Sequence, residues 1–208
     1  TPMKRFDSFH LLCTLACLGV LVLSSRALAE SVADESTSDE EVQVGTFYID
    51  LYEYPNRLGH NPLVDITFDD ATQRCVARGK RLCTEREWEL ACRGPDHTDY
   101  GYGDTFIPGR CNTPLPDGEG HWRRDTGTQP SGTHPDCRSP SGAIDMVGNV
   151  WEWTDGFYDR EQRWRVVRGG SWFNNLNFAR ADGRYGPGLA PDYRLDLIGF
   201  RCCRDADK

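Results

Sequence analysis

The sequence predicts an α+β domain of low regularity, with two short helices, short antiparallel strands and long loops. Three observations lead to this fold class. Helix signals are clear at only two places, strand-like alternation is short and scattered, and the stretch from Gly94 to Gly142 has hardly any periodicity. Gly, Pro, Asp and Ser dominate that stretch, yet it also carries Trp122 and two cysteines. We therefore expect an ordered, cross-linked loop region there.

The two helices have distinct start and stop signals. Thr67 is a capping residue for a helix that Gly79 stops. Thr84 and Glu87 form a capping box for a second helix, which ends at Gly94. Strand-like alternation occupies residues 42–54, and shorter strand-like pieces occupy 149–154, 164–168 and 199–203.

The first 29 residues have the pattern of a signal peptide. Lys4 and Arg5 precede an apolar run from Leu11 to Leu23, and the small residues of Ala27-Leu28-Ala29 follow. The run is about 13 residues, shorter than the about 20 that a spanning helix needs. We expect cleavage near Ala29 and an exported mature chain that is secreted, periplasmic or at the cell surface. A retained anchor is the alternative.

Charge divides the remainder into three parts. Residues 30–42 are rich in Asp and Glu, alternate with Ser and Thr, and predict an acidic disordered leader. Residues 43–204 are of a length that suits one domain, and 205–208 form a short tail. The net charge of −8, without a basic stripe, excludes nucleic acid as an expected partner. No apolar span follows the signal peptide in the sequence.

Cysteines are numerous for the length of the chain. Two of the nine cysteines lie in the predicted signal peptide, and seven remain. In an exported chain these predict disulfides, and the odd number leaves at least one thiol free or paired with another chain.

Four sequence blocks, in order, resemble the sulfatase-modifying-factor family, which includes the formylglycine-generating enzyme. The likeness runs from about Val44 to Cys203 and implies a low-regularity variant of the C-type-lectin fold. The blocks are GKRL at 79–82 continued by TE at 84–85 and EWE at 87–89, DM at 145–146 with GNVWEW at 148–153, RGGSW at 168–172, and GFRC at 199–202.

The resemblance implies an oxidase, but the catalytic cysteines are missing. Active family members oxidise a sulfatase cysteine to formylglycine with oxygen and copper(I), which two cysteines hold. The matching positions here are Asn174 and Ala179, and neither side chain binds copper(I). Trp151 and Ser171 match residues that line the family's cavity, or they are ordinary structural residues. We therefore expect a vestigial pocket, no catalytic residue and no copper.

Calcium is the cofactor that the resemblance implies. In the family a turn holds Ca²⁺ through an oxygen side chain, two main-chain carbonyls and a glutamate. The matching ligands are Asp145, the carbonyls of Gly148 and Val150, and Glu152, and hard oxygen ligands suit Ca²⁺. The alternative is a solvated Asp and Glu beside a Trp-rich strand. A second family site points, with altered spacing, to Asn112 and Asp125.

The family also implies a disulfide between Cys75 and Cys202. Cys111 and Cys137 both lie in the irregular region, and we expect them to pair. Cys83, Cys92 and Cys203 then remain, and their pairing stays open at this point.

Three functions follow as hypotheses. The first is a non-catalytic binding or structural module whose partner is a protein or glycan in the cell envelope or outside. The second is an oxidative protein-modifying enzyme of the same superfamily with an altered active site. The third is a subunit of an envelope assembly, tethered by the odd cysteine or the leader. The expected contact surface of the binding module consists of Trp122, Trp172, Phe173, Phe178 and Tyr185.

Overall fold

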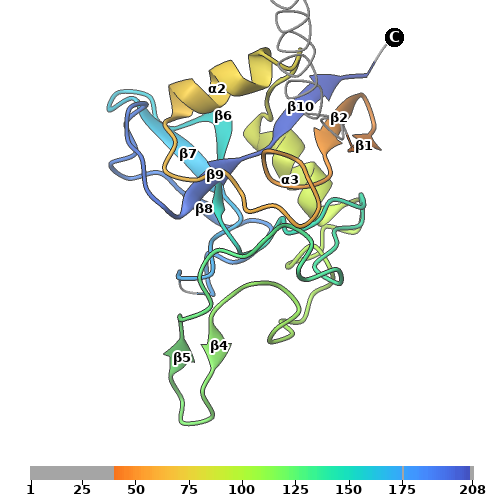
Figure 1. Cartoon of the computed structure of the whole chain (residues 1–208), viewed down its shortest axis with the longest axis vertical. Coiled ribbons are helices and arrows are strands. Elements are labelled where there is room, and N and C mark those ends of the chain that lie inside the picture. Colours follow the sequence, from red (N-terminus) through yellow and green to blue (C-terminus); the bar gives the residue numbers. More distant parts are fainter. Residues whose placement is uncertain (1–39, 175, 207–208) are drawn as a thin grey trace, which may run out of the picture. The chain divides into compact units, whose positions relative to one another are not determined.

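A computed structural model describes residues 40–174 and 176–206, so the predicted signal peptide and most of the acidic leader lie outside the described residues. Two four-stranded sheets, a small hairpin and two helices make up this part of the chain (Figure 1). The first sheet has the order β1-β2-β10-β3, with strands Glu41–Val44, Phe47–Asp50, Cys202–Asp205 and Arg81–Leu82. The second has the order β8-β7-β6-β9, with strands Arg184–Tyr185, Trp164–Arg168, Trp151–Asp159 and Ile198–Phe200. The hairpin pairs β4 (Leu115–Pro116) with β5 (Trp122–Arg123).

Both predicted helices are confirmed with their caps. Helix α2 spans Phe68–Val76, and the hydroxyl of Thr67 accepts the amide N–H of Asp70 at 3.0 Å. Helix α3 spans Glu85–Arg93, and Thr84 and Glu87 form the reciprocal capping box. Local signals are reliable here because a cap satisfies amide groups that the helix leaves without partners.

The strand expected over residues 42–54 is wrong as a single element. The chain turns at Gly45, whose φ is +57°, so β1 and β2 form an antiparallel hairpin. Strand β1 also begins at Glu41, inside the segment that the sequence assigns to the leader. Glu41 is held there by ion pairs to Lys80 and Arg204, each at 2.8 Å.

The strand expected over residues 199–203 belongs to two sheets. Residues up to Phe200 pair in parallel with β6, and residues from Cys202 pair antiparallel with β2 and β3. Arg201 lies at the change of sheet, and Asp205 extends β10 into the predicted tail. One short segment thus joins the two sheets.

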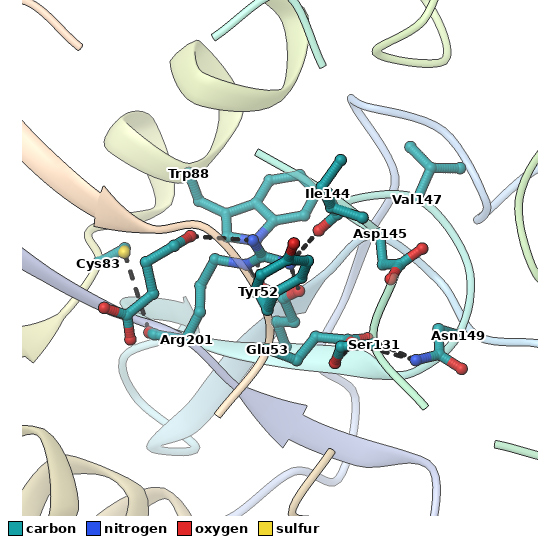
Figure 2. Close-up of polar contacts among 12 residues, drawn as sticks. Tyr52, Glu53, Cys83, Trp88, Ser131, Ile144, Asp145, Val147, Asn149 and Arg201 are labelled. Atoms are coloured by element: carbon teal, nitrogen blue, oxygen red, sulfur yellow. Dashed lines mark hydrogen bonds and ion pairs between the residues drawn. The ribbon is translucent and has the colours of Figure 1, made fainter. Parts of the chain in front are cut away.

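The side chain of Arg201 fills this junction and is 1% exposed (Figure 2). Its Nε and Nη2 donate to the two carboxylate oxygens of Glu152 at 2.8 and 2.7 Å. Its Nη1 and Nη2 also donate to the main-chain carbonyls of Asp50, Leu51 and Ile144 at 2.9–3.3 Å. The Nε1 of Trp88 donates to the same carboxylate at 2.6 Å, so α3 is tied to the junction as well.

Three disulfides connect distant parts of the described chain. Cys75–Cys202 and Cys111–Cys137 form as expected. Of the three cysteines whose pairing was open, Cys83 and Cys203 form the third disulfide. The first and third of these close separations of 127 and 120 residues. In the chain-entropy model one such bond contributes about 5 kcal/mol. Cys92 is the free thiol of the described residues; it lies on the inner face of α3 and is completely buried in the core.

Replacing Arg201 with Met is expected to destabilise the fold strongly. The substitution keeps most of the side-chain volume but leaves the Glu152 carboxylate buried without its cation, which costs about 3–5 kcal/mol. For a domain of this size the melting temperature is expected to fall by about 6 °C or more. Thermal unfolding followed by circular dichroism measures the change.

The matched control is Arg194→Met. Arg194 has a 55% exposed side chain and lies 3.9 Å from Asp70, so its loss is expected to change the melting temperature by less than about 2 °C. Equal effects of the two substitutions would contradict a special role for Arg201.

Candidate functional site

A cavity of about 260 Å³ opens on the second sheet at the start of β6. Its walls come from β6, β7, β8 and β9 and from the loops that precede β8 and β9. All but one of the lining residues are aromatic or aliphatic. They are Trp151, Val167, Asn174, Phe178, Tyr185, Leu189, Tyr193, Leu195, Leu197 and Ile198.

Asn174 is the amide in this otherwise apolar wall. Its Oδ1 accepts the indole N–H of Trp151 at 2.6 Å and also a short hydrogen bond from the hydroxyl of Ser171. Both acceptor positions of the amide oxygen are therefore in use. The two hydrogens of Nδ2 are the polar groups that Asn174 has left to offer.

The turn before Ser171 explains why these groups meet. Gly169 and Gly170 have φ values of +91° and +75°, a region that disfavours residues with a side chain. A Cβ on Gly170 would approach the Cα of Ala179 to 2.8 Å. Gly170 thus lets the 168–171 turn lie directly against Phe178 and Ala179, in the segment that carries the cavity wall.

Three aromatic rings of the wall contact one another. The ring centroids of Trp151 and Phe178 are 5.7 Å apart, those of Trp151 and Tyr185 are 6.1 Å apart, and those of Phe178 and Tyr185 are 5.8 Å apart. These separations are typical of packed aromatic pairs, so the rings form one continuous wall.

The vestigial positions predicted from the sequence are only partly brought together. Trp151, Ser171 and Asn174 are linked by hydrogen bonds, whereas Ala179 is completely buried in the hydrophobic cluster that also contains Cys92. Neither Asn174 nor Ala179 has a thiol. Burial raises the pKa of the Cys92 thiol, which keeps that group neutral.

The residues of the predicted contact surface lie in three places. Phe178 and Tyr185 line the cavity. Phe173 is 49% exposed and packs on Trp172 with ring centroids 5.5 Å apart. Trp122 lies on the hairpin strand β5 and packs on Phe106 at 6.1 Å.

The predicted calcium turn lies in a buried polar network (Figure 2). Asp145 and Glu152 are 3% and 1% exposed, but the two Glu152 oxygens are occupied by Arg201 and Trp88. The Oδ2 of Asp145 accepts the amide N–H of Gly132 at 2.7 Å. Gly148 and Val150 lie between these two acids in the sequence, and both are buried. The turn therefore offers its main-chain carbonyls and part of the Asp145 carboxylate to a cation.

Glu53 is a buried acid of this network that the sequence analysis missed. Its carboxylate accepts from Nδ2 of Asn149 and from the hydroxyl of Ser131, both at 3.0 Å. Burial, followed by the charges of Asp145 and Glu152, raises the pKa of Glu53 well above its ordinary value. Burial likewise raises the pKa of Asp145 to about 6. Three buried carboxyl groups thus surround one buried arginine.

The two residues predicted for the weaker second calcium site have different surroundings. Asn112 is buried and its Nδ2 donates to the carbonyl of Gly127 and to Oδ1 of Asn149, each at 2.9 Å. Within the described part of the chain, its own Oδ1 is a buried acceptor without a hydrogen-bond partner, and the buried hydroxyl of the neighbouring Thr113 has none either. Asp125, in contrast, has a 66% exposed side chain that lies 4.0 Å from Arg123.

A further acidic group lies on the β4–β5 hairpin. The carboxylates of Asp117 and Glu119 and the imidazole of His121 bring ligand atoms within 4.8 Å of one another, and all three residues are exposed. No sequence signal pointed to this group, and exposed acidic turns commonly hold no ion.

Comparisons with known proteins identify the fold and the family. Residues 52–206 match the sulfatase-modifying factor enzyme 1-like domain. The inactive C-alpha-formylglycine-generating enzyme 2 of Bos taurus is 37% identical over 155 residues, which cover 71% of this chain and 51% of that protein. The formylglycine-generating enzyme of Mycobacterium tuberculosis is 41% identical over 105 residues, 48% of this chain and 34% of that enzyme.

Solved structures agree on the fold. PvdO from Pseudomonas aeruginosa superposes with a TM-score of 0.61 at 20% identity, covering 76% of this chain and 80% of that one. CarF gives 0.57 at 17% identity, covering 81% and 96%. The predicted α+β, C-type-lectin-like fold is confirmed. This chain spans about half the length of the Bos taurus protein, and with its match over residues 52–206 it belongs to the sulfatase-modifying-factor family.

Proposed function

We propose that this chain is an exported, non-catalytic binding module of the family, stabilised by disulfides and calcium. The observation that carries the proposal concerns Asn174 and Ala179, the two positions that match the copper-binding cysteines of the active enzymes. Asn174 is engaged with Trp151 and Ser171, and Ala179 is packed in the core. What remains is a mainly apolar cavity, the usual form of a ligand-binding pocket.

The free thiol gives little support to an altered oxidase. Cys92 is completely buried, and burial raises its pKa, so it is neither a ready nucleophile nor a copper(I) ligand. The same burial makes Cys92 unsuitable as a tether to another chain. The name of the Bos taurus relative, an inactive enzyme, is consistent with a scaffold that functions without the oxidation.

Export is supported by the three disulfides, since such bonds persist in oxidising compartments. None of the helices in residues 40–174 and 176–206 is long and apolar enough to cross a membrane. The partner that we propose is a protein or a glycan of the cell envelope or the extracellular space.

Calcium is supported by the cost of burying these acids. Burial raises the pKa of Glu53 and of Asp145, and a divalent cation near Asp145 would stabilise the charged form of its carboxylate. The calcium ligands that we propose are Asp145, the carbonyls of Gly148 and Val150, and Glu152. Because Arg201 and Trp88 occupy the oxygens of Glu152, its contribution is expected to be the smallest. For the second calcium site we propose the amide Oδ1 of Asn112, which has no hydrogen-bond partner among the described residues and is the type of oxygen ligand that Ca²⁺ prefers.

The purified chain is expected to make no formylglycine. Incubation with copper(I), oxygen and a sulfatase-derived cysteine peptide should leave the peptide mass unchanged and consume no oxygen above the level without protein. The formylglycine-generating enzyme of Mycobacterium tuberculosis, assayed alongside, is the positive control. Formation of the peptide aldehyde would contradict the proposal.

Removal of calcium is expected to lower the melting temperature of the full chain by several degrees, since a ligand at 100 times its dissociation constant contributes about 2.7 kcal/mol. Asp145→Asn should abolish the difference between calcium and chelator. The effect should be larger at about pH 7.5 than at about pH 5, because Asp145 becomes charged as the pH rises through its raised pKa of about 6.

The matched control for calcium is Asp117→Asn. Asp117 belongs to the exposed hairpin group, so its substitution should leave the calcium effect intact. Identical melting temperatures with calcium and with chelator would contradict the calcium proposal. If Asp117→Asn abolished the calcium effect and Asp145→Asn did not, the calcium site would lie on the β4–β5 hairpin instead.

A further inference from the structure

We propose that the β6 cavity binds an aromatic side chain of a partner polypeptide and that Asn174 donates a hydrogen bond to a carbonyl beside that ring. This inference rests on the proposed binding function and specifies its ligand. It follows from the two hydrogen bonds that Oδ1 of Asn174 accepts, from the size of the cavity and from the apolar rim around the cavity.

The amide of Asn174 fixes the polarity of the ligand. Its Oδ1 receives the N–H of Trp151 and the hydroxyl of Ser171, which also fixes the orientation of the amide. Nδ2 is then a donor in a mainly apolar wall, to which Tyr185 and Tyr193 add their hydroxyl groups. A donor favours an acceptor such as a carbonyl oxygen and disfavours an ammonium group, because a cation has no lone pair to accept the N–H.

The size and shape of the cavity favour a single ring. Its volume of about 260 Å³ is below the roughly 300–1,000 Å³ of pockets for drug-sized ligands. Trp151, Phe178 and Tyr185 lie 5.7–6.1 Å apart and form one continuous wall. Such a wall offers ring faces and edges to a further aromatic group, whereas a cage for a cation needs rings that surround an open centre.

The rim favours a polypeptide over a free small molecule. Tyr185, Tyr193 and Leu195 line the cavity, and each is still 38% exposed. A ring held in the cavity leaves this apolar rim in water, whereas residues on either side of the ring in a polypeptide would cover it. Burial of that additional area is expected to strengthen binding.

Three probes with the same phenyl ring test the proposal on the full chain by titration calorimetry. They are N-acetylphenylalaninamide, phenethylammonium and an end-blocked Gly-Gly-Phe-Gly-Gly peptide. The wild type is expected to bind the amide, to bind the ammonium at least tenfold more weakly, and to bind the peptide more tightly than the amide. Equal binding of the amide and the ammonium, or no binding of either phenylalanine probe at millimolar concentration, would overturn the proposal.

Asn174→Asp is the decisive variant. The carboxylate can still accept from Trp151 and Ser171, but it replaces the Nδ2 donor with an acceptor. Binding of the amide is expected to fall at least tenfold while binding of phenethylammonium appears, a reversal that a merely structural role of Asn174 would not produce. Unchanged preference in this variant would contradict the assignment of the donor.

Two further variants separate the cavity from the rest of the surface. Tyr185→Ala should weaken all ring probes, whereas Trp122→Ala, an exposed aromatic residue outside the cavity, should change nothing. Loss of binding in Trp122→Ala with retention in Tyr185→Ala would place the ligand elsewhere. Failure of these binding tests leaves the formylglycine assay unaffected, so the ligand class and the absence of catalysis are tested separately.

Discussion

The buried ion pair between Arg201 and Glu152 is the interaction on which the rest of the structure depends. Arg201 lies where the chain passes from the second sheet to the first, and five described hydrogen bonds engage its guanidinium. Glu152 lies on the central strand β6 and also accepts from Trp88 of α3. A buried charge is tolerated only when it is paired and fully hydrogen-bonded. Both sheets and α3 must therefore keep their relative positions.

This constraint explains why the family is recognisable although the catalytic cysteines are absent. The most distinctive side chains of the sequence blocks are Trp88, Glu152 and Arg201, and all three meet at the sheet junction. These three side chains hold the scaffold together, and none of them lines the cavity. The positions that matched copper ligands, Asn174 and Ala179, take part in none of these hydrogen bonds, so they can change without loss of the framework.

Asn174 shows how such a change can be accommodated. An alanine at this position would leave the indole N–H of Trp151 and the hydroxyl of Ser171 facing an apolar wall, and unpaired buried donors are costly. The amide oxygen accepts from both. The substitution therefore removes the thiol chemistry, preserves the cavity and introduces one donor that a ligand can use.

Local signals predicted much of the fold, and long-range contacts account for the rest. The caps at Thr67 and Thr84 fixed both helices because capping depends on adjacent residues only. The expected strand over 42–54 proved to be a hairpin because the turn at Gly45 interrupts the alternation without changing its period.

The site was less predictable than the fold. The role of Glu53 depends on Ser131 and Asn149, which are distant in sequence. The carboxylate oxygens of Glu152 are occupied because Arg201 donates to both of them. The surroundings of Glu53 and of Glu152 could therefore not be inferred from sequence spacing. The pairing of Cys83 with Cys203 likewise follows from the adjacency of β3 and β10.

Within residues 40–174 and 176–206 the framework is intact, and the one free thiol, Cys92, is buried away from oxidation chemistry. Thiol labelling with peptide mapping, performed on the native and the denatured full chain without reductant, tests this claim most directly. We predict that, among residues 40–206, only Cys92 is labelled and only after denaturation. Labelling of Cys92 together with Cys83 or Cys203 in the native protein would contradict the account and would place reactive thiols in the core.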